Sequence, residues 1–331
     1  MGRTGFVFHP LYTDHLTGLE HPEKPERVLT IVRRLRSAGL LDDLDRLEPE
    51  PVETCWLEAV HDAEYIRRVQ KACQGGRPIM DSSDTAISAG SYHAARLAAG
   101  GGLAAADRVM DGTWSNAFVA CRPPGHHAES SLAMGFCLFN NAAVTAAYLR
   151  RRHGVKRVAI VDWDVHHGNG TQHLFEEDPS VYYISLHQWP LYPGTGRVDE
   201  RGRGKGRGAT LNCPMDPGDG DDAYLSTFES AVLPELERFS PGVVILSAGF
   251  DAHAADPLSA TQVTAAGFRR MSRLVIGLAG ATSRGRIVSL LEGGYDLEAL
   301  AGSVQAHVEE LRGAPAAPTA GPGGGHGPAG G

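Results

Sequence analysis

The sequence predicts an α/β protein in which a central, mostly parallel β-sheet is flanked by helices on both faces. Six short segments rich in Val, Ile and Phe are spread along the chain, at residues 5–8, 115–120, 157–162, 180–186, 242–249 and 286–291. Their apolar residues do not alternate with polar ones, which favours strands that are buried on both sides. Segments with helical periodicity lie between them, and an alternation of strands and helices is typical of a parallel sheet.

Three helices are predicted between these strands. Residues 27–40 carry one apolar stripe, and Gly39 is expected to end that helix. Residues 141–154 and 261–280 show similar patterns. No intervening stretch has the composition of an interdomain linker, so we expect a single domain over residues 1–312.

Two segments depart from this pattern. Residues 200–208, ERGRGKGRG, are predicted to form a flexible, basic, solvated loop, because their glycines match no known phosphate-binding arrangement. Contact with phosphate or with an acidic partner is the alternative. Residues 313–331 are rich in Gly, Pro and Ala and contain too few apolar side chains to form a core, so we expect a disordered tail.

The composition restricts the possible partners. The 331-residue chain has a formal net charge of −8, which gives no broad basic surface, so nucleic acid is not an expected partner. The five cysteines form no C-x-x-C pair, which suits a reducing cytosol. We find no signal peptide and no run of about 18 apolar residues, so no membrane partner is expected. The sequence therefore predicts a cytoplasmic protein, and its Ala-, Gly- and Arg-rich composition points to a bacterium with a GC-rich genome.

Reactive side chains follow four of the predicted strands at the point where each strand ends. In chain order they are His126 and His127, the acidic and imidazole cluster of residues 162–167, Asp251, and Tyr295. The carboxyl ends of parallel strands meet at one edge of a sheet, and ligands bind beyond that edge. The sequence therefore predicts an active site there.

The cluster at residues 162–167 has the ligand types of a metal site. In an extended chain Asp162, Asp164 and His166 would share one face, and Asp251 would add a carboxylate from another strand. Together they form a set of one histidine and two carboxylates, and three protein ligands with an open position are typical of catalytic zinc. A cation would also offset the cost of burying two carboxylates together. A hydrogen-bonded Asp/His network is the alternative.

The adjacent His126 and His127 follow the rigid turn RPPG, and neighbouring histidines rarely both bind one metal ion. We expect an acid–base pair, with Asp162 orienting one ring and Asn169 the other. A turn-capping or surface role is the alternative. Tyr295 follows two glycines that let the backbone bend, and a phenol there could stabilise an oxyanion beside a metal. A core tyrosine is the alternative for this residue.

Together, several motifs resemble the zinc-dependent histone deacetylase family, most closely its class II members and bacterial amidohydrolase relatives: RPPGHH, GFCLFNNAA, DWDVHHGNGTQ, SLHQWPLYPGTG, SAGFDAH followed by DPL, and EGGY. The resemblance runs from about His9 to His307 and implies the arginase/deacetylase α/β fold. It also implies a deacetylase domain that hydrolyses an acyl amide with zinc-activated water. The typical substrate of the family is N-acetyl-lysine in a protein or peptide.

The resemblance also implies roles for individual residues. Zinc, one ion per chain, would be held by Asp164, His166 and Asp251. His126 and His127 would form the acid–base pair, with Asp162 and Asn169 as partners, and Tyr295 would stabilise the oxyanion. A structural potassium ion would contact Asp162, Asp164, His166, Ser185 and Leu186. The substrate would meet Gly135, Phe136, Tyr192, Leu258 and Gly294, and core packing is the alternative for the two aromatic residues.

Three other functions are considered. An arginase-type manganese enzyme would need a carboxylate two residues after the ligand histidine, where this sequence has Gly168. An acetylpolyamine amidohydrolase is the second, because the rim acids Asp81 and Asp84 could meet a cationic substrate, although a solvated turn is the alternative for them. Polyamine-selective class II relatives carry glutamate at the position of Leu258, so this leucine favours lysine-bearing substrates, but some bacterial polyamine enzymes lack that glutamate. The third, an inactive acyl-lysine binding module, would have lost a ligand or Tyr295. The oligomeric state is left open.

Overall fold

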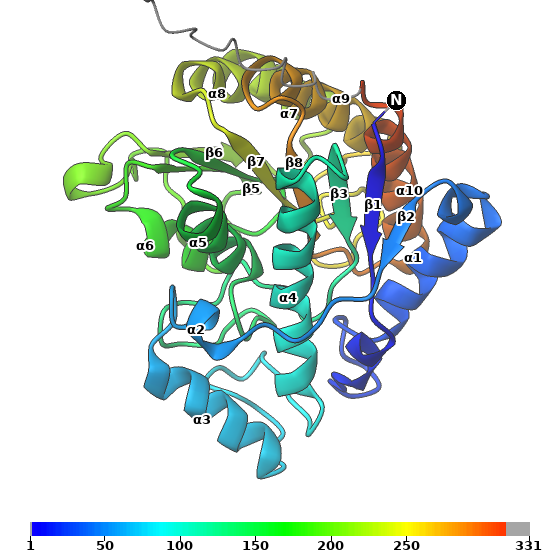
Figure 1. Cartoon of the computed structure of the whole chain (residues 1–331), viewed down its shortest axis with the longest axis vertical. Coiled ribbons are helices and arrows are strands. Elements are labelled where there is room, and N and C mark those ends of the chain that lie inside the picture. Colours follow the sequence, from blue (N-terminus) through cyan, green and yellow to red (C-terminus); the bar gives the residue numbers. More distant parts are fainter. Residues whose placement is uncertain (1, 316–331) are drawn as a thin grey trace, which may run out of the picture.

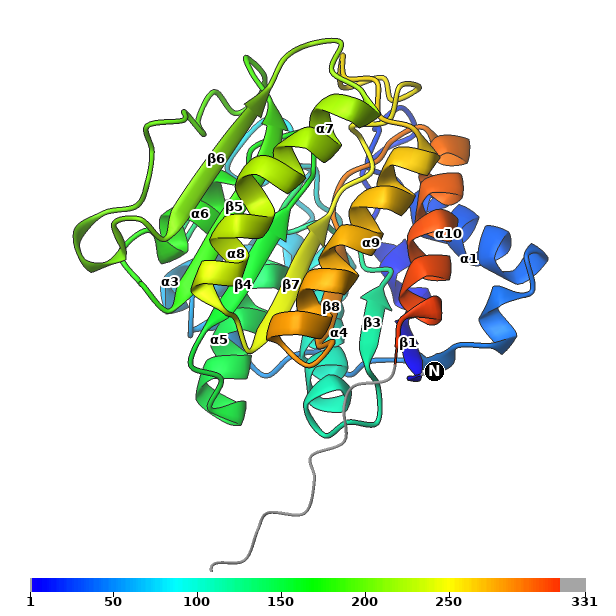
Figure 2. The same ribbon diagram turned by 90° about the horizontal axis from the view of Figure 1, so that it is seen from above.

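The computed structural model describes residues 2–315, which form an eight-stranded sheet between two layers of helices (Figures 1 and 2). The strand order is β2-β1-β3-β8-β7-β4-β5-β6, and all neighbouring strands run parallel. The strands are β1 (Thr4–Val7), β2 (Asp45–Leu47), β3 (Asn116–Val119), β4 (Val158–Asp162), β5 (Val181–Gln188), β6 (Thr210–Met215), β7 (Val243–Ala248) and β8 (Ile287–Leu291). The predicted parallel α/β architecture is confirmed.

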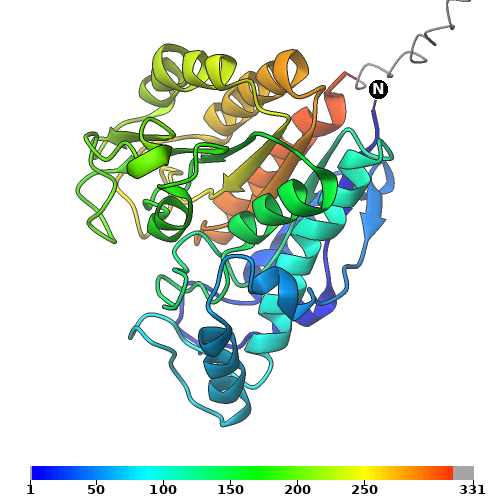
Figure 3. The same ribbon diagram turned by 60° about the vertical axis from the view of Figure 1, so that its left-hand side comes forward.

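Helices cover both faces of the sheet (Figure 2). One layer contains α1 (Glu26–Ser37), α7 (Asp221–Thr227), α8 (Leu233–Phe239), α9 (Ala265–Thr282) and α10 (Leu297–Gly313). The other contains α4 (Ser91–Met110), α5 (Asn141–His153) and α6 (Asn169–Phe175). Outside this second layer lie α2 (Thr54–Leu57) and α3 (Ala63–Gln74), and Figure 3 shows α3 beyond the end of α4. The three predicted helices correspond to α1, α5 and α9.

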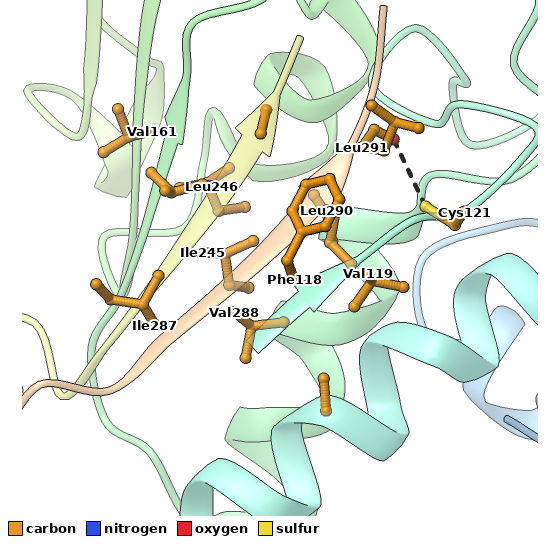
Figure 4. Packing of buried hydrophobic residues seen from close by; sticks show 14 of the residues in the cluster. Phe118, Val119, Cys121, Val161, Ile245, Leu246, Ile287, Val288, Leu290 and Leu291 are labelled. Carbon is orange, nitrogen blue, oxygen red and sulfur yellow. Dashed lines mark hydrogen bonds between the residues drawn. The ribbon is translucent and has the colours of Figure 1, made fainter. Parts of the chain in front are cut away.

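The central strands are buried along their whole length, which explains their continuous apolar sequences. Every residue of β3, β4, β5, β7 and β8 is buried. Consecutive side chains of a strand point to opposite faces. In β3, the ring of Phe118 lies 5.7 Å from that of His307 in α10, whereas Val119 lies beside Gly101 of α4. Figure 4 shows this apolar packing around β3, β7 and β8.

Two strands, β2 and β6, are not among the predicted ones, and both lie at an edge of the sheet. β2 has only three residues, none of them buried, and β6 contains the exposed Pro214. An edge strand is paired on one side only, so it tolerates proline and polar residues that weaken the sequence signal.

Most residues of the predicted basic loop, 200–208, are exposed or half-buried, as expected. The buried Gly206, however, packs against the backbone of residues 176–178, and Arg203 forms an ion pair with Glu176 at 3.2 Å. The predicted tail lies outside the described residues from residue 316 on, and α10 extends to Gly313. Among residues 2–315, no helix has the length and apolar character needed to cross a bilayer.

We expect the buried His307 to make stability depend on pH. Its ring nitrogens lie 2.7 Å from the hydroxyl of Ser272 and 2.9 Å from that of Ser289, and burial lowers its pKa to about 3. An unfolded histidine titrates near 6.5, so at lower pH the unfolded chain binds a proton that the folded chain does not. The contribution is complete above pH of about 6.5 and is lost as the pH falls towards 3.

The measurement is the free energy of unfolding of the wild type and of His307→Asn at pH 7.5 and pH 5. Because the variant lacks this titration, the stability advantage of the wild type should shrink by about 2 kcal/mol between the two pH values. A difference between the two proteins that is the same at both pH values would contradict the assignment.

Candidate active site

The four strands that precede the predicted reactive residues are adjacent in the sheet, in the order β3-β8-β7-β4. Parallel pairing places their carboxyl ends at one edge. The segments that follow these strands bring together His126 and His127 after β3, Tyr295 after β8, Asp251 after β7, and Asp164 and His166 after β4. The predicted convergence of these side chains is what the structure shows.

Asp164, His166 and Asp251 form a compact, buried set of metal-ligand atoms, all within 4.8 Å of one another. The Nδ1 atom of His166 lies 3.1 Å from Asp164 Oδ1 and 3.1 Å from Asp251 Oδ2. The other oxygen of each carboxylate accepts a backbone hydrogen bond: Gly293 donates to Asp164 at 2.7 Å, and Val165 donates to Asp251 at 2.9 Å. Each carboxylate is thus oriented by the backbone, with one oxygen facing the imidazole.

The route of the chain through this set differs from the prediction. β4 ends at Asp162, so Asp164 and His166 do not share a face of an extended strand. Instead, Asp162 Oδ1 accepts a hydrogen bond from the backbone N–H of Asp164 at 3.1 Å, and Asp164 Oδ1 accepts one from that of His166 at 2.9 Å. Local hydrogen bonds from an aspartate side chain to the backbone two residues on bend the chain into a turn. The residues converge as predicted, but through a turn.

Charge repulsion within this set indicates that it fits a cation. Burial, together with the nearby Asp164 carboxylate, raises the pKa of Asp251 to about 7. Burial alone would also raise the pKa of Asp164, but His126 and His166 lower it. Burying two carboxylates together costs free energy of desolvation unless a positive charge lies between them. One imidazole nitrogen and two carboxylate oxygens are donors that a divalent metal ion such as zinc accepts.

The histidine pair has the predicted partners. The Nδ1 atom of His126 lies 3.0 Å from Asp162 Oδ2, and the hydroxyl of Tyr183 donates to the same oxygen at 3.0 Å. The Nδ1 atom of His127 lies 2.7 Å from Asn169 Oδ1. The two rings are 4.0 Å apart, centroid to centroid. One ring is therefore paired with a carboxylate and the other with an amide.

These different partners separate the proton affinities of the two rings. Burial alone would lower the pKa of His126, but the Asp164 and Asp162 carboxylates raise it to about 10. Burial lowers the pKa of His127 well below its usual range, and the neighbouring His126 and His166 lower it further. Pairs of titratable groups whose surroundings drive their pKa values apart are typical of acid–base sites.

A pocket of about 300 Å³ opens over these residues. Its lining consists of Asp84, His127, Gly135, Phe136, His166, Leu191, Tyr192, Leu258 and Tyr295. This volume is at the lower end for ligand sites, which range from about 300 to 1,000 Å³. The pocket therefore suits a slender chain rather than a bulky ligand.

Four of the five predicted substrate-binding residues line this pocket, and Gly135 shows why glycine is needed. Its φ is +57°, and a Cβ atom there would lie 2.2 Å from the ring of His127. Gly294 is not in the lining: its carbonyl accepts a hydrogen bond from Arg27 Nε at 2.6 Å. Its role as a substrate contact stays a prediction.

The two rim acids differ. Asp84 lies in the pocket lining, where its side chain accepts a hydrogen bond from the backbone N–H of Gly135 at 3.3 Å. Asp81 forms an ion pair with Arg68 and accepts from the N–H of Ala133 at 2.9 Å, so it is occupied in holding the loop. Only Asp84 could meet a substrate in the pocket.

Three residues of the predicted potassium site lie on the adjacent strands β4 and β5, and the other two, Asp164 and His166, follow β4. Asp162 of β4 is the register partner of Ser185 of β5, and both are fully buried, as is Leu186. The hydroxyl of Ser185 is hydrogen-bonded to His187 Nδ1 at 2.9 Å. The potassium site itself stays a prediction.

The sequence analysis did not assign several buried residues that support the site. Glu292 of the EGGY motif accepts hydrogen bonds from the backbone N–H groups of Gly125 at 2.6 Å and His126 at 3.2 Å. Asp256 accepts one from the N–H of Tyr295 at 2.7 Å. Both acids lie within recognised motifs, EGGY and DPL, but nothing in the sequence pairs them with these backbone groups.

A buried ion cluster around Glu23 was also missed. Glu23 binds Arg122 through both carboxylate oxygens, at 2.5 and 2.7 Å, and Arg27 at 3.2 Å. Burial alone would raise the pKa of Glu23, but Arg122 and His15 hold it well below its usual range. The Arg27 guanidinium also lies 4.9 Å from the centroid of the Tyr295 ring. One carboxylate therefore connects the turn before the histidine pair with the loop that carries Tyr295.

A buried set of two carboxylates and an imidazole lies beside a histidine pair and a small pocket lined by His127 and Tyr295. These features define a candidate metal-dependent hydrolase of the α/β type. Residues 21–311 match the family model of the histone deacetylase domain, and the chain belongs to the histone deacetylase family. Its eight-stranded parallel sheet is the arginase/histone-deacetylase fold that the resemblance implied.

The names of three relatives agree with this family assignment. The chain is 41% identical over 297 residues to a probable deacetylase of Archaeoglobus fulgidus, covering 89% of this chain and 82% of that protein. It is 41% identical over 294 residues to a histone deacetylase-like amidohydrolase of Pseudomonas aeruginosa, covering 88% and 77%. It is 40% identical over 335 residues to the polyamine deacetylase HDAC10 of Homo sapiens, covering 96% of this chain but only 49% of that protein.

A solved structure supports the same conclusion for the fold. The crystal structure of the HDA15 HD domain matches with a TM-score of 0.89 and 40% sequence identity, covering 95% of this chain and 90% of that one. Because the relatives include deacetylases and an amidohydrolase, the comparisons support a hydrolase activity for this family member.

Proposed function

We propose that this chain is a zinc-dependent amidohydrolase that removes the acyl group from an acylated amine, with N-acetyl-lysine in a protein or peptide as the preferred substrate. The observation that carries this proposal is that His166, one of the three clustered candidate ligands, lines a small pocket together with His127 and Tyr295. We place the catalytic domain in residues 1–312, because a single sheet contains all the strands that support the site.

Zinc held by Asp164, His166 and Asp251 would supply a Lewis acid and an activated water. His127 donates its Nδ1 proton to the Asn169 amide, which leaves Nε2 available to accept a proton from water. His126 is hydrogen-bonded to the Asp162 carboxylate, a partner that stabilises an imidazolium able to protonate the leaving amine. The hydroxyl of Tyr295 would donate to the carbonyl oxygen as negative charge develops on it. The products would be a free amine and a short carboxylate.

The residues Asp162, Ser185 and Leu186 would hold a structural potassium ion beside this centre, together with Asp164 and His166. Three of these residues lie in buried, hydrogen-bonded positions on β4 and β5, where a monovalent cation would balance part of the negative charge. This part of the proposal rests on the family resemblance.

Two alternatives are less well supported. An arginase-type second metal ion would need a carboxylate at Gly168, but a Cβ atom there would lie 2.4 Å from Asp162 Oδ2 and 2.5 Å from the hydroxyl of Tyr183. An inactive acyl-lysine binding module would not need to keep the complete set of ligands, both histidines and Tyr295. The acetylpolyamine alternative is supported by the human polyamine deacetylase among the relatives and by Asp84 in the pocket lining.

The test combines metal analysis with hydrolysis assays on an acetyl-lysine peptide and on acetylated polyamines, side by side. We expect about one zinc per chain and the higher kcat/KM on the peptide. A zinc-loaded, folded protein that hydrolyses none of these amides would contradict the proposed function and favour the binding module. A higher kcat/KM on polyamines would identify the alternative substrate class.

Replacing Leu258 by glutamate should shift substrate choice towards acetylated polyamines. Leu258 lines the pocket, so a carboxylate there would attract a second ammonium group on the substrate. We expect the ratio of kcat/KM for acetylpolyamine to that for acetyl-lysine peptide to rise at least about tenfold, equivalent to about 1.4 kcal/mol. Leu258→Gln is the matched control, because it has the same shape without the charge. Equal ratios in both variants would show that charge at this position does not select the substrate.

A further inference from the structure

The hydrogen bonds of His127 continue beyond Asn169 to the protein surface. Asn169 Nδ2 donates to Glu129 Oε1 at 2.5 Å, and the ring Nδ1 of His173 lies 2.8 Å from the same oxygen. Asn169 is buried, the Glu129 side chain is 19% exposed, and that of His173 is 40% exposed. Glu129 is two residues after His127 in the sequence, yet the proposed chemistry gives it no role.

The surroundings of the Asn169 amide determine its orientation. Its Nδ2 group is surrounded by three acceptors: the Glu129 carboxylate at 2.5 Å, the backbone carbonyl of His127 at 3.4 Å and the sulfur of Met134 at 3.4 Å. An amide rotated by half a turn would place its oxygen against the carboxylate, with no proton between two acceptors. The amide oxygen must therefore face His127.

An amide oxygen can only accept, so the Nδ1 atom of His127 must donate. In a neutral imidazole with its proton on Nδ1, the lone pair lies on Nε2, the other ring nitrogen. His127 is the histidine of the pair that lines the pocket. The tautomer of a ring that faces the substrate is thus determined by a carboxylate that does not touch the pocket.

The position of Glu129 is itself well defined. Its backbone N–H donates to the carbonyl of Leu132 at 3.0 Å, and its carbonyl is bonded to His61 Nδ1 at 2.9 Å. A carboxylate acceptor also holds an N–H group more strongly than a neutral one. Glu129 is therefore anchored at its backbone and offers a charged acceptor at its side chain.

We propose that Glu129 is a positioning residue that fixes the orientation of the Asn169 amide and, through it, the proton of His127 on Nδ1. The proposal rests on the proposed function of His127 as an acid–base residue. Its effect is expected in kcat rather than in KM, because Glu129 is not part of the pocket lining.

The test exchanges donor and acceptor between the two residues. In Asn169→Asp, the new carboxylate would face that of Glu129 at hydrogen-bond distance, so we expect kcat to fall by about 100-fold. In Glu129→Gln, the amide oxygen can still accept from Asn169, so we expect a loss of about threefold. In the double variant, the glutamine NH₂ group can donate to the new carboxylate, which can in turn accept from His127. We expect the double variant to be at least about tenfold more active than Asn169→Asp.

A double variant no more active than Asn169→Asp, at equal zinc content and equal Tm, would overturn the proposal, because a merely structural role predicts no rescue. Glu177→Gln, at an exposed glutamate two residues after α6, is the matched control and should leave kcat unchanged.

A second measurement does not depend on catalysis. The ring ¹⁵N chemical shifts of His127 in the zinc-loaded protein should show the Nδ1–H tautomer in the wild type and a mixture of tautomers in Glu129→Ala. An unchanged tautomer in that variant would also overturn the proposal. If the wild type hydrolyses no acyl amide but shows this difference in tautomer, the proposed function fails while the positioning role stands.

Discussion

Replacing Tyr295 by phenylalanine should leave the metal ion bound and lower kcat by about 100- to 1,000-fold, the range found when one oxyanion donor is removed. Tyr295 lines the pocket, and it is not among the three clustered residues that could hold a metal ion. Phenylalanine would keep the contacts of the ring with Phe136, 5.8 Å away, and with Arg27. The loss would therefore report the hydroxyl alone. The measurements are kcat on an acetyl-lysine peptide and the zinc content per chain.

Tyr192→Phe is the matched control, because it makes the same chemical change at the other tyrosine of the pocket. Tyr192 is 39% exposed and its ring lies 5.1 Å from that of His127. Its hydroxyl has no role in the proposed reaction, so we expect a loss smaller than about tenfold. Equal losses in the two variants, or full turnover in Tyr295→Phe, would refute the oxyanion role of Tyr295.

Replacing Gly293 by alanine should strongly weaken metal binding and, with it, lower activity. An added Cβ atom would lie 2.0 Å from Asp251 Oδ2 and 2.6 Å from Asp164 Oδ2. A Cβ atom does not approach a carboxylate oxygen this closely, so one carboxylate or the loop itself must move away. The Gly293 N–H, which orients Asp164, would move with it. We expect zinc affinity to fall at least about 100-fold, the upper effect of disturbing the partners of metal ligands.

Gly302→Ala provides the control for this variant. Gly302 lies within α10, and a Cβ atom there would meet nothing within 4 Å. Alanine is preferred to glycine inside a helix by about 1 kcal/mol, so this variant should bind zinc as the wild type does and have an equal or higher Tm. Zinc titration of both variants makes the comparison. Wild-type zinc affinity in a folded Gly293→Ala protein would show that Asp164 and Asp251 are not the ligands.

The predictability of the fold follows from where each strand lies. Central strands such as β4 and β7 are covered on both faces, so their continuous apolar sequences were sufficient to identify them. β2 and β6 lie at the edges, where half of each strand is unpaired and the sequence is less restricted. The predicted helices were those with a clear apolar stripe or run.

The site could be predicted from the sequence only in part, for a different reason. The candidate metal ligands and the histidine pair could be expected to lie together because each follows a strand, and parallel topology brings strand ends together. The partners Glu23 and Glu292 were missed, because their contacts join segments far apart in the chain. Arg122, for example, is 99 residues from Glu23. Propensity and periodicity describe local structure, so they cannot say which buried acid meets which distant base.

The single carboxylate of Glu23 balances the charge of two buried arginines that support the site. The same side chain neutralises Arg122, which precedes the histidine pair, and Arg27, which holds the carbonyls of Glu292 and Gly294. Without this carboxylate, both guanidinium groups would remain in the interior with no counter-charge, and the turn before the histidine pair and the loop that carries Tyr295 would lose their common anchor.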